Sequence, residues 1–147
     1  MTTRSTAAVL NRLLAIVYHS LPMYLADVKT WVGPDAESLK TLNQIVADHR
    51  LYAQRIADAL LDRHERVEPG EYPMEFTGLH DCALEYLVGQ LIIYQKRDIR
   101  RIEECVSELR EDPGARALAE EVLGAARAHL ELLEELRPAA TAAGAIA

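Results

Sequence analysis

Three ionisable side chains stand on helical faces that are otherwise apolar, where leucine or valine is the usual occupant. They are His49, Glu85 and His129, and each belongs to a different segment of helical periodicity. A carboxylate buried without a partner is unstable, so Glu85 requires compensation. Hydrogen bonds from the two imidazoles would supply it, and so would a divalent metal ion bound by all three side chains. Either arrangement requires three helices to meet around one interior point.

The apolar pattern predicts four helices that can bring these side chains together. Apolar residues recur at spacings of three and four, as in an amphipathic helix. The helices are expected at about residues 6–32, 35–66, 78–110 and 112–137. Pro22 lies inside the first helix and removes one backbone hydrogen bond, so we expect a kink there.

The connections between these helices have unequal lengths, which predicts their order in space. Tight turns join the first helix to the second and the third to the fourth, so each pair should form an antiparallel hairpin. The stretch VEPGEYPMEFT, residues 67–77, separates the pairs, and its two prolines and one glycine argue against helix. Eleven extended residues reach about 36–40 Å, roughly the length of a helix of about 27 residues. We therefore predict a four-helix bundle with one long crossover, and with Tyr72 and Phe76 along the outside of the helices.

The third helix carries a second apolar line on a different face. This line consists of Leu84, Leu87, Leu91 and Tyr94. Every helix of a four-helix bundle has a solvent side, so an additional apolar face predicts a subunit contact. We expect a homo-oligomer, at least a dimer.

Length and composition set the class of protein. The chain has 147 residues, of which 50% are hydrophobic, with few glycines and prolines, as is typical of one all-α domain with a sizeable core. We expect this domain to span residues 1–147, with its core at about 6–137 and a flexible tail at 138–147. A formal net charge of −7 argues against binding to nucleic acid or to an anionic membrane. Without a membrane span or a recognisable secretory signal, we predict a cytoplasmic protein in which Cys82 and Cys105 are reduced and packed as small apolar residues.

Four stretches of the chain resemble the bacterioferritins and related ferritin-like di-iron proteins. They are LNRLLAIVYHSLPMY at 10–24, DHRLYA at 48–53, DCALE at 81–85 and AARAHLELLEEL at 125–136. The likeness covers most of the chain, from about Leu10 to Leu136, and implies a ferritin-like four-helix bundle.

The resemblance also implies that most of the family's iron ligands are missing. Of the six ligand positions, Glu85 and His129 keep the family's residue types, and the others hold Val17, His49, Tyr52 and Ala126. His49 and Ala126 stand where the family has the carboxylates that bridge two irons, so standard di-iron ferroxidase activity is not expected. Arg50 stands where the family has its haem-binding methionine, so haem is not expected either.

Two functions follow from this pattern. The first is a ferritin-like protein that has lost its di-iron centre and acts as a non-catalytic structural or interaction module, with Glu85 in a metal-free hydrogen-bond network. The second is a metal-binding protein or oxidoreductase with one mononuclear iron or zinc site in the bundle core. The resemblance implies that His49, Glu85 and His129 surround one of the two iron positions. Two histidines and one carboxylate form a recognised set for Fe(II) or Zn(II). We favour the first function, which requires no cofactor, and assign no catalytic residue.

Overall fold

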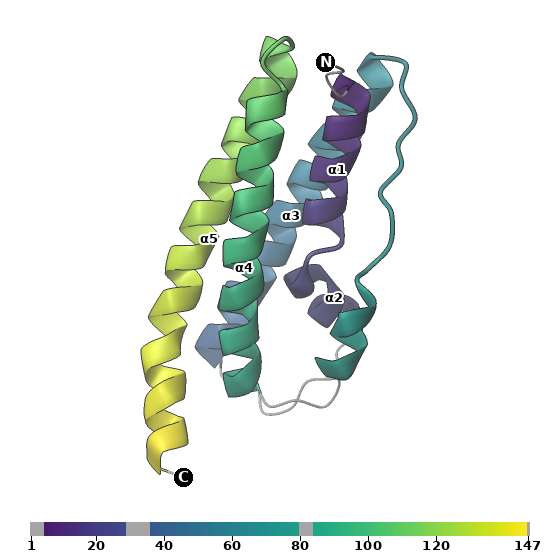
Figure 1. Cartoon of the computed structure of the whole chain (residues 1–147). Coiled ribbons are helices and arrows are strands. Elements are labelled where there is room, and N and C mark those ends of the chain that lie inside the picture. Colours follow the sequence, from purple (N-terminus) through teal and green to yellow (C-terminus); the bar gives the residue numbers. More distant parts are fainter. Residues whose placement is uncertain (1–4, 29–35, 80–83, 147) are drawn as a thin grey trace.

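The chain is entirely helical in its regular structure over the residues that the structure describes (Figure 1). The computed structural model describes residues 5–28, 36–79 and 84–146, and for residues 27–28, 84–85 and 137–146 it describes the backbone alone. The α-helices are α1 (Thr6–Tyr18), α2 (Leu21–Val28), α3 (Ala36–Asp62), α4 (Leu84–Glu108) and α5 (Pro113–Ile146), and a short 3₁₀ helix, η1, spans Met74–Leu79. The prediction of an all-α protein is confirmed. No described helix combines the length and the apolarity needed to cross a lipid bilayer.

Figure 1 shows how the helices are arranged in space. α1 and α3 lie side by side and run in opposite directions, as do α4 and α5. Between these pairs, residues 63–73 form an irregular segment that returns beside α1 to η1, so that α3 and α4 point the same way. Asn11 of α1 holds this segment. Its amide nitrogen donates to the carbonyl oxygen of Arg66 at 2.9 Å, and its amide oxygen accepts from the N–H of Glu68 at 2.7 Å.

The first predicted helix is broken in two. α1 ends at Tyr18, and Pro22 lies in the first turn of α2. In a continuous helix, proline has no N–H for the carbonyl of Tyr18, and its ring collides with that carbonyl. Ser20 caps the new helix, because its Oγ accepts from the N–H of Met23 at 3.4 Å and its carbonyl accepts from the N–H of Tyr24 at 3.0 Å. The structure therefore has a complete break where a kink was predicted.

The last helix is longer than predicted. Its backbone stays helical to Ile146, past Pro138, where the sequence predicted the end of the helix. The flexibility expected of residues 138–147 stays a prediction. These final residues are rich in alanine, which has the highest helix propensity of all residues. The single backbone hydrogen bond lost at Pro138 does not end the helix.

The core consists of two clusters of buried apolar side chains. One cluster joins α1, α3, α4 and α5, and it includes Cys105, a free thiol that is 0% exposed, as predicted. The other joins α2, α3, α4, α5 and η1. Cys82 lies outside the described residues.

The second apolar face of α4 is covered within the same chain. Leu87 and Leu91 are 0% and 3% exposed and belong to a buried cluster with Phe76 of η1. Tyr94 packs edge-on against Phe76, with 5.2 Å between the ring centroids. Phe76 is 1% exposed, so it is a core residue and does not lie along the outside of the helices as predicted. This face of α4 therefore no longer supports a dimer, and the oligomeric state stays a prediction.

Candidate functional site

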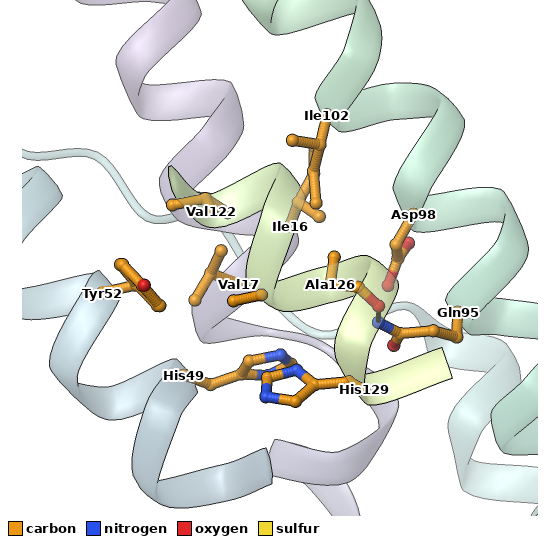
Figure 2. Close-up of a pocket in the computed structure, with 11 residues that line it drawn as sticks. Ile16, Val17, His49, Tyr52, Gln95, Asp98, Ile102, Val122, Ala126 and His129 are labelled. Atoms are coloured by element: carbon orange, nitrogen blue, oxygen red, sulfur yellow. Dashed lines mark hydrogen bonds between the residues drawn. The ribbon is translucent and has the colours of Figure 1, made fainter. Parts of the chain in front are cut away.

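Two of the three predicted site residues lie side by side (Figure 2), and each is near the middle of its helix. His49 comes from α3 and His129 from α5, and their ring centroids are 5.4 Å apart, with the ring planes at 60°. The two residues are 8% and 3% exposed. Their positions on apolar helical seams thus predicted their burial correctly.

Ser20 holds one ring nitrogen of His49. Nδ1 of His49 lies 2.8 Å from Oγ of Ser20, a residue that is 3% exposed. The break before Pro22 makes this contact possible, because the residue that caps α2 also faces α3. Burial, and to a lesser degree the charge of nearby His129, lowers the pKa of His49 to about 3. His49 is therefore neutral at physiological pH, and the serine hydroxyl can either donate to it or accept from it.

His129 is hydrogen-bonded to Asp48, a carboxylate that the sequence analysis did not predict as part of the site. Nε2 of His129 lies 2.8 Å from Oδ2 of Asp48, the residue before His49 on α3. An ionised carboxylate can only accept, so Nε2 carries the proton and donates it. Nδ1 of His129 is buried and has no hydrogen-bond partner in the part of the chain that the structure describes. The sequence signal that could have pointed to Asp48 is its position directly before His49, at the edge of the apolar face of the helix.

A small cavity lies against the two imidazole rings. A water-sized sphere can occupy about 10 Å³ of it, which is close to the lower limit for one water molecule. Its apolar wall includes Val17 of α1 and Ala126 of α5, and three further polar side chains line it, Tyr52, Gln95 and Asp98 (Figure 2). Side chains from α1, α3, α4 and α5 therefore converge on this point.

Gln95 is a buried polar residue that α4 presents to the cavity. It is 3% exposed, and its Nε2 donates to the carbonyl oxygen of Ala126 at 2.8 Å. Glu85, the third predicted site residue, lies in the first turn of α4, and its side chain is outside the described residues. It precedes Gln95 by ten residues, which is about 15 Å along a helix axis. The prediction that Glu85 joins the two histidines stays untested.

Asp98 is the carboxylate that α4 presents to the same cavity. It is 7% exposed, and its Oδ1 lies 3.5 Å from Nη1 of Arg101 and 3.8 Å from Nε of Arg97. Burial raises the pKa of Asp98 to about 6, against the opposing effect of the two guanidinium groups. Its place in the charged run KRD concealed this burial, since such a run is typical of a solvated helix face.

The residues around the cavity do not fit a di-iron centre. Two irons need carboxylates that bridge them, but His49 and Ala126 stand where the resemblance expects these bridging residues, and both line the cavity. Of the described residues that line the cavity, only Asp98 carries a carboxylate. Among all residues whose side chains are described, no three of the types His, Cys, Asp and Glu lie close enough together to hold a metal ion.

No family model, curated protein or solved structure matches this chain. The resemblance to ferritin-like proteins therefore depends on the residues of this sequence.

Proposed function

We propose that this chain is a ferritin-like four-helix protein that has lost its di-iron centre and acts as a non-catalytic structural or interaction module. The observation that carries the proposal is the pair of apolar side chains, Val17 and Ala126, at the cavity where four helices converge. The resemblance expects iron-binding carboxylates at both positions. Without their oxygens, two like-charged cations cannot be held close together.

The directions of the helices support the ferritin-like part of the proposal. α1 forms one antiparallel pair with α3, and α4 forms another with α5. Residues 63–73 join the two pairs along the length of α1. Two hairpins joined by one long crossover are the arrangement of ferritin-like bundles.

The polar groups left in the interior are suited to holding helices in place. The contact of Ser20 with His49 ties α2 to α3, and the contact of His129 with Asp48 ties α5 to α3. Gln95 ties α4 to the backbone of α5 at Ala126. Satisfied polar contacts in a core define one packing arrangement, because any shift in register would leave them unpartnered. A scaffold that presents a surface to a partner benefits from such rigidity.

The test of this proposal is oxidation of Fe(II) by dioxygen. Fe(II) is added anaerobically to the metal-free protein, air is admitted, and the formation of ferric iron is followed by its absorbance. We expect the rate to equal that in buffer without protein. A faster rate that depends on protein concentration, and that His129→Ala abolishes, would show a working iron site and overturn the proposal.

A second candidate function is the mononuclear metal site. The observation in its favour is the buried Nδ1 of His129, which has no hydrogen-bond partner among the described residues.

A further inference from the structure

Each of the two central histidines uses one ring nitrogen for a contact outside the pair. Nδ1 of His49 is taken by Ser20, and Nε2 of His129 is taken by Asp48. Elimination leaves Nε2 of His49 and Nδ1 of His129 for the cavity that both rings line. Histidines that bind metals show this division, in which one nitrogen faces the ion while a carboxylate, carbonyl or other acceptor fixes the opposite one.

Nδ1 of His129 is the buried polar atom that lacks a partner among the described residues. Nε2 donates its hydrogen bond to Asp48, so whenever the ring is neutral its lone pair is on Nδ1. That atom is buried, and the described residues offer it no donor. A buried polar atom of this kind normally has a partner, and a water molecule or a cation in the adjoining cavity would supply one. His129 itself is 3% exposed, so bulk solvent does not satisfy it.

The separation of the rings suits a shared ion. A metal about 2.1 Å from one nitrogen of each ring, bound at a tetrahedral angle, would hold the ring centroids about 5 Å apart. The centroids lie 5.4 Å apart. Edge-to-face rings without an ion lie at similar distances, so the distance is compatible with an ion, and the unpartnered nitrogen of His129 is the observation that favours a ligand.

We propose that His49 and His129 bind one divalent transition-metal ion of the zinc class, through Nε2 of His49 and Nδ1 of His129. Ser20 and Asp48 orient the two imidazoles. Zinc is the representative ion because imidazole is one of its common ligands and because it readily adopts tetrahedral geometry. A water molecule completes the coordination as far as the small cavity allows. Asp98, the carboxylate at the cavity, lies among the same lining residues and lowers the cost of the added charge.

This inference rests on the second candidate function, and it can fail while the scaffold proposal stands. Two protein ligands supply about half of the binding free energy of a four-ligand zinc site, so we expect a Kd on the order of 1–100 µM. Isothermal titration of the EDTA-treated and desalted chain with Zn²⁺ should give one site per chain. His129→Gln and His49→Gln, which preserve side-chain volume approximately, should each weaken that site at least tenfold.

The matched control is His64→Asn. His64 is exposed and has a φ of 59°, a left-handed conformation that asparagine tolerates. The variant removes one imidazole from the surface and should leave the Zn²⁺ affinity unchanged. This control separates the proposed site from binding at surface histidines and carboxylates.

A variant outside the ligand pair keeps the test decisive if the histidine variants do not fold. The side chain of Asp48 is 40% exposed, so Asp48→Asn should be tolerated. Loss of such an orienting carboxylate should weaken Zn²⁺ binding by about 10- to 100-fold. Wild-type protein that binds no Zn²⁺ at millimolar concentration would overturn the proposal, and so would affinity that His129→Gln and Asp48→Asn leave unchanged. Neither result would bear on the iron-oxidation test of the scaffold.

Discussion

Replacement of Ser20 by alanine removes two contacts at one buried point. Oγ of Ser20 accepts from the N–H of Met23 at 3.4 Å and lies 2.8 Å from Nδ1 of His49. Loss of an N-cap typically costs about 1 kcal/mol. A buried ring nitrogen left without a partner costs about 1–3 kcal/mol more. We therefore expect Ser20→Ala to lower the free energy of unfolding by about 2–4 kcal/mol.

Ser5 provides the matched control, because it caps α1 at the protein surface. Its Oγ accepts from the N–H of Ala8 at 3.2 Å. Ser5→Ala should therefore cost the cap alone, about 1 kcal/mol. The difference between the two variants measures the Ser20–His49 contact.

The measurement is urea denaturation followed by far-ultraviolet circular dichroism, with EDTA present so that metal plays no part. An unchanged m value would show that each variant exposes the same surface on unfolding. In a His49→Leu background, Ser20→Ala should cost only about 1 kcal/mol, because the ring nitrogen is no longer there. The reasoning is refuted if Ser20→Ala costs no more than Ser5→Ala in the wild-type background.

Three further predictions concern other parts of the molecule. Folding lowers the pKa of His49 from 6.5 to about 3, so its contribution to the free energy of unfolding falls as the pH drops. Folding raises the pKa of Asp98 from 3.8 to about 6, so its contribution rises over the same range and opposes that of His49. Asp98→Asn leaves the histidine effect alone, and from about pH 6 to about pH 4 the variant should lose about 1.4 kcal/mol per pH unit relative to wild type in urea titrations; parallel curves would contradict this. Asn11→Ala releases the irregular segment from α1 and should raise its cleavage rate in limited proteolysis, whereas Asn43→Ala, at an exposed site on α3, should not. A homodimer should sediment with twice the chain mass of 16.4 kDa, and Leu51→Glu, at a position of α3 that is 57% exposed, tests whether this face forms the contact; a wild-type monomer would end the dimer prediction.

The helical period of the sequence was sufficient to predict which side chains point inward. His49 and His129 fall on seams whose other members are apolar, and a helix must turn such a seam away from water. Both are buried, and they lie in contact. Their partners were not predictable in the same way. Ser20 reaches His49 only because the helix breaks ahead of Pro22, and whether a proline kinks or breaks a helix depends on what the following residues pack against.

The position of α4 along its axis relative to α5 was the other property that the local sequence pattern could not predict. Several positions of α4 share its inward face, and the pattern does not say which of them lies level with His129. The extended path of residues 63–73 and the packing of α4 on α5 decide that level, and they bring Gln95 and Asp98 to the cavity.

The sequence by itself determined that the chain is helical, where several of its helices begin, and that two histidines lie inside. Those properties depend on residues within one or two turns of each other, so they can be read locally. Only the tertiary structure decided that Asp48 and Ser20 contact the imidazoles, that Phe76 of η1 covers the second face of α4, and that one buried nitrogen of His129 has no hydrogen-bond partner among the described residues. Each of these depends on the meeting of segments far apart in the chain, where packing and loop geometry set distances that no local pattern records.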